Sequence, residues 1–214
     1  MRIRGVVSDL WRYPVKSMQG EQLTVGTVTA TGLVGDRAFA VRDVATGAVL
    51  SAKREPRLLL ALAAVGGDTV TVTPPTGAPV AGASVDASLS QWLGRDVRLD
   101  AAADFAYVDE AHLHLVTEDE LGSWPVRRFR PNVVVRGVPD LDELVGERLQ
   151  LGGVVVEIDK RTKRCAMPTM AQPGLAKDVG VLRTLARGRD LRLGVYAHVV
   201  APGRLEVGAP ITVG

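Results

Sequence analysis

Short apolar runs rich in Val, Leu and Thr recur along the whole chain, and glycines separate many of them. Runs of about four to eight residues bounded in this way are typical of β-strands. They occupy residues 22–28, 37–42, 58–65, 69–73, 97–100, 113–116, 132–135, 154–158, 191–200 and 204–207. Gly47, Gly67, Gly153 and Gly203 fit the tight turns between them. We therefore predict a chain built mainly of strands.

Helical patterns are few. Residues 86–93 form one apolar face, and Gly94 suits the position just after a helix end. A second helix is predicted to begin at Thr117, because its hydroxyl and the carboxylate of Glu120 match a capping box. A third is predicted over 181–187. Since helices and strands do not alternate regularly, we predict a barrel, or two packed small barrels, rather than a doubly wound sheet.

The length of the chain, 214 residues, allows one large domain or two small ones that pack closely together. Residues 73–83 are rich in Pro, Gly and Ala and fit a loop between two halves of the fold. We place an approximate boundary near residue 100, which gives modules of residues 1–100 and 101–214.

The sequence also limits the compartment and the partners. The longest apolar run, 58–65, is much shorter than the roughly 18 to 20 residues that cross a bilayer, and no signal-like apolar region follows the N-terminus. One cysteine cannot form an internal disulfide, which favours the reducing cytoplasm. A net charge of +2 and few aromatic residues do not favour nucleic-acid binding. We expect a cytoplasmic protein with neither membrane nor nucleic acid as partner.

Positive charge gathers before the only cysteine, Cys165. Lys160, Arg161, Lys163 and Arg164 occupy four of the five preceding positions. Nearby cations favour the thiolate, which is both the nucleophilic and the metal-binding form of cysteine. The strand predicted over 154–158 would bring this segment, as a basic loop, to one end of a sheet. Two interpretations remain: a reactive or metal-binding thiol, or a solvated charge run beside a cysteine that fills an apolar gap.

Three other segments carry basic residues. Lys16 and Ser17 offer an amine and a hydroxyl in a turn, a common way to hold phosphate, although no glycine-rich loop precedes them. Arg37 stands at the head of a predicted strand. Arg130 can present a planar fork to an anion, and the Asn132 amide can bind the edge of a heterocycle. Each segment taken alone also fits a structural or surface role.

Two further groups predict no catalytic site. His112 and His114 share one face of a predicted strand, but no other His or carboxylate completes a metal site, so we expect them to be structural or exposed. Residues 118–120 are acidic and fit the first turn of a helix, where the helix dipole stabilises negative charge.

Taken together and in this order, four segments resemble the MOSC family, named after the C-terminal domain of molybdenum cofactor sulfurases. The segments are residues 13–17, 35–37, 130–132 and 164–165. Further similarity at 54–58 and 181–185 extends the resemblance over nearly the whole chain. It implies a mainly β, barrel-like MOSC fold over 101–214, a smaller N-terminal β-barrel module over 1–100, and a few short helices.

The pattern is similar to that of amidoxime-reducing components and their bacterial counterparts. The resemblance implies a molybdenum cofactor, in which a pterin binds the metal, and makes Cys165 both the catalytic residue and a thiolate ligand of molybdenum. The other residues that it assigns to cofactor binding are Lys16, Ser17, Arg37, Thr117, Arg130, Asn132 and Arg164.

The same resemblance implies an oxidoreductase that reduces small N-hydroxylated compounds. Its electrons would come from a separate protein of the ferredoxin, flavodoxin or cytochrome type. Two alternatives stay open: a sulfur carrier with a persulfide on Cys165, and a non-catalytic module that binds or delivers the cofactor. The chain departs from the reductase pattern at Lys163, where many relatives have a small hydroxyl residue, and at 171–178, which lacks an acidic pair. Lys163 is expected to alter the pocket mouth or the substrate preference.

Overall fold

The computed structural model describes residues 2–67, 69–102, 106–107, 110–138 and 140–213. Strands predominate in these ranges, as predicted. They are β1 (Arg2–Arg12), β2 (Glu21–Leu23), β3 (Val25–Thr29), β4 (Gly32–Leu33), β5 (Phe39–Asp43), β6 (Leu62–Gly66), β7 (Thr69–Thr73), β8 (Val80–Ala81), β9 (Val97–Ala101), β10 (Leu113–Thr117), β11 (Val133–Arg136), β12 (Arg148–Leu151), β13 (Val154–Lys163), β14 (Arg192–Ala201), β15 (Gly203–Glu206) and β16 (Pro210–Val213).

Short helices connect and cover these strands, which confirms the predicted minor role of helix. The α-helices are α1 (Ser84–Leu93), α2 (Glu118–Leu121) and α3 (Gly180–Gly188), and the 3₁₀ helices are η1 (Pro56–Leu60), η2 (Val126–Arg128), η3 (Leu141–Leu144) and η4 (Met167–Thr169). α1 ends at Gly94 in the left-handed conformation, as its sequence predicted. None of the helices in the described ranges has the length and apolar character that a membrane crossing needs.

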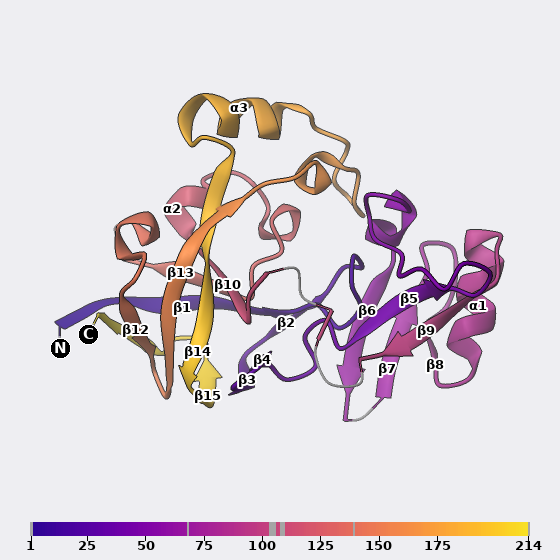
Figure 1. The fold of residues 1–214 in the computed structure, drawn as a ribbon, viewed down its shortest axis with the longest axis horizontal. Coiled ribbons are helices and arrows are strands. Elements are labelled where there is room, and N and C mark those ends of the chain that lie inside the picture. The colour runs from indigo at the N-terminus through magenta and orange to yellow at the C-terminus, as the bar shows by residue number, and fades with distance from the viewer. Residues whose placement is uncertain (1, 68, 103–105, 108–109, 139, 214) are drawn as a thin grey trace.

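Seven strands close into a barrel. Their order is β11-β10-β14-β13-β12-β16-β1, and β1 pairs again with β11, so the sheet returns to its start. The pairs are antiparallel except β10 with β11, which is parallel. Figure 1 shows β1 as the indigo strand that runs across the barrel. Closure pairs the backbone groups that the edges of an open sheet would expose, and it confirms the predicted barrel.

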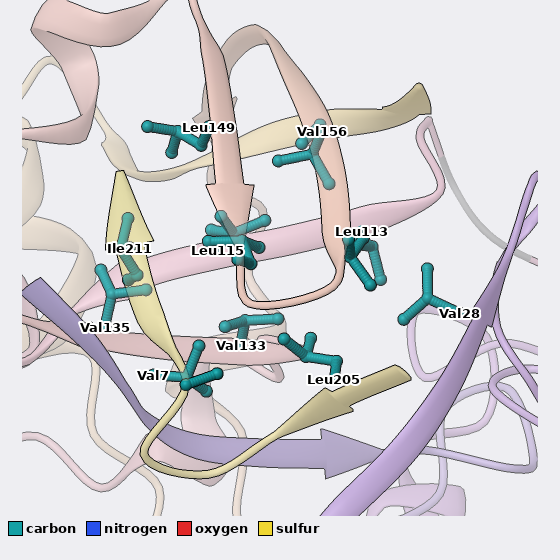
Figure 2. Close-up of a cluster of buried hydrophobic side chains, with 14 of the residues drawn as sticks. Val7, Val28, Leu113, Leu115, Val133, Val135, Leu149, Val156, Leu205 and Ile211 are labelled. Carbon is teal, nitrogen blue, oxygen red and sulfur yellow. The ribbon is translucent and has the colours of Figure 1, made fainter. Parts of the chain in front are cut away.

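The barrel is filled by aliphatic side chains from alternate strand positions (Figure 2). On β10, Leu113 and Leu115 belong to this inner cluster, while Val116 belongs to a separate cluster outside the barrel with residues of α2, α3 and β14. The same alternation gives His114 the outer face of β10, toward neighbouring elements rather than the barrel interior.

A smaller body lies beside the barrel, at the right of Figure 1. It combines the hairpin of β5 and β9, the sheet of β6, β7 and β8, and helix α1 around a core of its own. β1 belongs to the barrel with strands from the second half of the chain, and β3 pairs with β15. The module boundary near residue 100 stays a prediction.

Several segments differ from the sequence prediction, and β4, β8, β12 and β16 are strands that it did not contain. Residues 58–60, expected in a strand, lie in η1, where Pro56 begins a 3₁₀ turn before the chain extends into β6. The strand predicted to end at residue 158 continues to Lys163, so most of the basic segment before Cys165 is strand rather than loop. β1 was not predicted as a strand.

The capping box at α2 formed as predicted. The Thr117 hydroxyl accepts a hydrogen bond from the Glu120 backbone at 2.9 Å, and the Glu120 carboxylate accepts one from the Thr117 backbone at 3.0 Å. We expect Thr117→Ala to lower the free energy of unfolding by about 1 kcal/mol. Urea titration measures this loss, and Thr117→Ser, which keeps the hydroxyl, is the matched control. Equal stability of the Ala and Ser variants would show that the cap contributes nothing.

Candidate functional site

A cavity of about 370 Å³ is lined by residues of the barrel and of the smaller body. It contains seven of the eight residues that the sequence assigned to the site: Lys16, Ser17, Arg37, Arg130, Asn132, Arg164 and Cys165. The other residues lining it are Ser51, Lys53, Tyr107, Glu110, Ala111, His114, Arg128, Phe129, Lys163, Met167, Pro168 and Tyr196. Segments far apart in the sequence therefore meet at one place.

Thr117 is the predicted site residue that does not line the cavity. Its side chain is buried at the start of α2, where the hydroxyl is engaged in the capping box. The structure assigns it this structural contact, and its contact with a cofactor stays a prediction.

Backbone strain is concentrated in the cavity wall. Ser17, Arg37 and Arg130 have φ angles of 68°, 48° and 55°, and they are three of the five non-glycine residues with positive φ in the described part of the chain. This conformation costs roughly 1 to 3 kcal/mol for each residue and persists only where surrounding contacts impose it. Such contacts are present: the Arg37 amide donates to the Tyr13 carbonyl at 2.8 Å, and the Ser17 hydroxyl accepts from the Ala52 amide at 2.9 Å.

Arg37 and Arg130 are oriented by a buried tyrosine and by backbone carbonyls. Their guanidinium carbons lie 5.0 and 4.2 Å from the centre of the Tyr13 ring. Arg130 donates to the Met18 carbonyl, and Arg37 donates to the Asp36 carboxylate and to the Arg130 carbonyl. Stacking on an aromatic face favours a cation and limits its rotation. Tyr13 thus positions both arginines from behind the cavity wall.

Asn132 connects the cavity wall to two barrel strands. Its side-chain oxygen accepts from the His114 amide at 3.2 Å, and its side-chain nitrogen donates to the Trp11 carbonyl at 3.3 Å. Arg37 also donates to the side-chain oxygen at 3.5 Å, so of the two donor and two acceptor positions of this amide one N–H remains for a ligand.

Arg164 is held by three acceptors. It donates to the carbonyls of Leu193 at 3.0 Å and Phe129 at 3.2 Å, and another of its nitrogens contacts the Nε2 atom of His114. Burial lowers the pKa of Arg164 to about 10, so the side chain remains charged at neutral pH. Burial and the Arg164 charge lower the pKa of His114 well below 6.5. His114 is therefore neutral, and its Nε2 atom accepts from Arg164.

The pKa shift of His114 predicts a pH dependence of stability. Below about pH 6.5 the unfolded chain binds a proton at this histidine and the folded chain does not. Folding is therefore progressively less favourable as the pH falls, by up to about 1.4 kcal/mol per pH unit from this group. Urea titrations between pH 7.5 and 5.5 should show a shallower dependence for His114→Gln than for the wild type, whereas Lys177→Gln, at an exposed position outside the cavity, should keep the wild-type slope. Identical slopes in all three proteins would contradict the assignment.

Cys165 is a free and exposed residue in the cavity wall. The interpretation of Cys165 as filler of a buried apolar gap is therefore wrong. The basic segment before it divides into two parts: Lys160 pairs with Glu110 and Arg161 with Asp142, both at 2.8 Å, while Lys163 and Arg164 line the cavity. Two of its four cations thus serve surface ion pairs, and two lie at the site.

Arg128 holds the segment that follows Cys165, a role that the sequence did not reveal. The buried guanidinium donates to the carbonyls of Pro168 at 3.0 Å and Ala176 at 2.9 Å. Several carbonyls along this segment thus accept hydrogen bonds from one planar guanidinium group. A lysine ammonium group cannot reproduce this geometry. The sequence shows three arginines close together but not which one would turn inward.

We expect Arg128→Lys to loosen this segment. The charge is retained, but at least one carbonyl loses its donor, which costs about 1 to 3 kcal/mol. Amide hydrogen exchange should become faster between residues 167 and 178 and stay unchanged in the barrel strands. Arg127→Lys alters a neighbouring arginine that does not line the cavity and is the control. Unchanged exchange in Arg128→Lys would show that Arg128 does not hold this segment in place.

The composition of the wall defines the ligand that it suits. Seven described lining side chains are cationic, namely Lys16, Arg37, Lys53, Arg128, Arg130, Lys163 and Arg164, and one, Glu110, is a carboxylate. No group of three His, Cys, Asp or Glu able to hold a metal ion occurs in the described ranges. The site therefore fits a multiply charged anion. A metal beside Cys165 would need most of its ligands from a bound organic molecule.

Comparisons with known proteins agree with this picture. The chain is 25% identical to mitochondrial amidoxime-reducing component 1 of Homo sapiens, over 97% of this chain and 82% of that protein. It is 27% identical to molybdenum cofactor sulfurase 2 of Culex quinquefasciatus, over 49% of this chain and 15% of that protein. Among solved structures, the YuaD protein of Bacillus subtilis superposes with a TM-score of 0.51 at 14% identity, covering 98% of this chain and 94% of that one, which shows a shared fold.

Two family models cover nearly the whole chain. Residues 4–127 match the MOSC N-terminal beta barrel domain, and residues 94–212 match the MOSC domain. Each match covers more than half of the chain, and the two overlap around the predicted module boundary. The chain belongs to the MOSC family.

Proposed function

We propose that this protein binds a molybdenum cofactor in the cavity and reduces N-hydroxylated compounds, with Cys165 as the protein ligand of the metal. One observation carries the proposal: an exposed thiol lies in the wall of a cavity that is lined by seven cationic side chains. The names of the relatives, amidoxime-reducing components and a molybdenum cofactor sulfurase, support the same cofactor and a reductase role.

The lining residues fit this cofactor. A phosphorylated pterin dithiolene carries several negative charges, and such a ligand needs matched cations and hydrogen-bond donors when it leaves water. Lys16, Ser17, Arg37 and Arg130 would hold its anionic part, with the two arginines already oriented by Tyr13. The remaining amide capacity of Asn132 suits the edge of a heterocycle.

The protein side of the reaction rests on Cys165 and its surroundings. When bound, the cofactor supplies the two-electron chemistry and an open coordination position for the substrate. Soft thiolate is a suitable additional ligand for a metal that dithiolene sulfurs already bind. Arg164, charged and held by two carbonyls, lies in the same wall and interacts electrostatically with Cys165. Arg128 fixes the segment after the thiol, so the sulfur keeps its place in the wall.

Each turnover removes the hydroxyl oxygen of the substrate as water and consumes two electrons and two protons. We propose that a separate ferredoxin, flavodoxin or cytochrome supplies the electrons. The single cysteine of the sequence supports a reducing compartment, the cytoplasm.

One preparation tests the proposal. The protein is produced in a host that makes the molybdenum cofactor, its metal and pterin contents are measured, and reduction of benzamidoxime is followed with reduced methyl viologen as electron donor. About one molybdenum and one pterin per chain, together with formation of benzamidine, are expected. A metal-free protein with a persulfide on Cys165 would point instead to sulfur transfer. Bound cofactor without turnover under any donor would point to a storage or delivery module.

A further inference from the structure

Two of the seven cationic side chains in the cavity wall differ from the rest. Lys53 and Lys163 are exposed, and within the described ranges the ammonium group of neither makes a hydrogen bond or an ion pair. Lys53 lies in the loop between β5 and η1, and Lys163 is the last residue of β13, two positions before Cys165. We refer to Lys53 and Lys163 as the exposed lysine pair.

The other five cations are already engaged by the protein. Lys16 donates to the Tyr107 carbonyl at 3.0 Å, and Arg37 pairs with Asp36. The remaining three, Arg128, Arg130 and Arg164, donate to backbone carbonyls. These contacts fix the direction of each charge, as preorganised binding of a cofactor requires. We refer to these five residues as the cradle. The exposed lysine pair lacks such contacts and keeps flexible ammonium groups at the solvent side of the same cavity.

Neighbouring acids do not neutralise this pair. Glu110, the one carboxylate among the described lining residues, pairs with Lys160 at 2.8 Å. Beside Lys163 on the adjacent strand stands Arg192, whose partner is Asp190 at 2.8 Å. The approach to Cys165 therefore retains uncompensated positive charge, which attracts anions and raises their local concentration.

We propose that the exposed lysine pair selects substrates with a carboxylate group, so that the preferred substrates are anionic N-hydroxylated compounds. This inference rests on the proposed function, because it names the class of molecule that the same cavity reduces. The ammonium groups would bind the carboxylate near the opening while the N-hydroxyl end of the molecule points toward Cys165. A neutral compound of the same shape lacks this attraction.

Matched substrates measure the effect. Benzamidoxime is neutral and 4-carboxybenzamidoxime carries one negative charge, and the readout is the ratio of their kcat/KM values with reduced methyl viologen as donor. Exposed ion pairs of this kind contribute up to about fivefold in binding at low salt, and salt screens them. We expect the ratio to favour the carboxylate compound and to fall by about fivefold in Lys53→Gln or Lys163→Gln and by up to about 20-fold in the double variant. The preference should disappear at high ionic strength.

The controls separate substrate selection from cofactor binding. Lys177→Gln removes an exposed lysine that does not line the cavity and should keep the wild-type ratio. Metal and pterin contents should be the same in all variants. An unchanged ratio in the double variant would overturn the inference, and so would a loss of cofactor in it, because the lysines would then belong to the cradle.

A binding measurement keeps the inference testable if the proposed reaction fails. Should the metal-loaded wild type reduce neither compound, the proposed function is wrong, and calorimetric titration with benzoate and benzamide still examines anion selection. Tighter binding of benzoate that the double variant weakens supports the exposed lysine pair. Equal binding of benzoate and benzamide, or benzoate binding that the double variant leaves intact, refutes it.

Discussion

Replacing Cys165 with serine is expected to reduce the turnover of an N-hydroxylated substrate by at least about 100-fold. Substitution of a residue that merely contacts a metal ligand often costs 10-fold to 100-fold, and this substitution replaces the proposed ligand itself. A serine hydroxyl is harder than a thiolate and is protonated at neutral pH, so it is a poor substitute as a ligand for molybdenum. Because Cys165 is exposed, the free energy of unfolding should change by less than about 0.5 kcal/mol. Steady-state kinetics and urea titration on the same samples test both statements.

Pterin content makes the Cys165 experiment more specific. The cations of the cradle are untouched by the substitution, so pterin retention should fall far less than turnover. Cys165→Ala, which removes the side-chain donor altogether, should behave like Cys165→Ser. Full reductase activity in Cys165→Ala would rule out the thiolate-ligand mechanism, whatever the metal content.

Gly194→Ala is expected to lower the free energy of unfolding by more than about 3 kcal/mol, the largest stability effect that we predict. The φ angle of Gly194 is +74°, and an added Cβ would lie 2.5 Å from the Leu115 carbonyl oxygen and 2.6 Å from a Val116 methyl carbon. Both are parts of β10 and cannot move without disturbing the barrel. The Cβ would also lie 2.8 Å from His114 Nε2, the atom that accepts from Arg164.

Gly47→Ala is the matched control, because Gly47 has a similar φ of +69° but no atom within 4 Å of the added Cβ. It should lose only the conformational part, about 1 kcal/mol. Urea denaturation of the two variants separates strain from collision. If Gly47→Ala and Gly194→Ala lowered the free energy of unfolding equally, close packing around Gly194 would contribute nothing to the effect.

Most strands with continuous apolar runs could be predicted from the sequence, whereas β1 and the last part of β13, which carry several polar residues, could not. β10, β11 and β14 carry apolar runs that read as strands without knowledge of the fold. In β1, Ser8, Asp9 and Arg12 interrupt the apolar residues, and in β13 the last four residues include three cations. The two segments are strands despite these polar side chains because their backbone groups pair with neighbouring strands when the barrel closes. That pairing depends on the whole fold and cannot be seen in a local segment of sequence.

The site was predictable where similarity to a family marks it and not where tertiary packing creates it. Residues such as Lys16 and Arg130 belong to segments with a recognisable order along the chain. His114 and Arg128 reach the cavity because β10 shows its outer face there and because η2 turns one arginine inward. Lys53 lies in a loop whose own sequence has no signal for a ligand. Thr117 shows the reverse case, since its local capping pattern predicted the hydrogen bonds of its side chain.

Pairing of β1 with both β11 and β16 has a consequence for the order in which the protein folds. Residues near the two ends of the described chain are hydrogen-bonded neighbours, as Arg2 is opposite Val213, so the barrel cannot close on the ribosome before β16 has emerged. Such distant pairing slows folding, whereas the smaller body uses contacts nearer in sequence. Residues 16–37 and 130–165 of the cavity wall are brought together by the same fold, so the proposed cofactor would be bound only once the barrel has formed. A chain arrested before β16 should be protease-sensitive in the barrel strands.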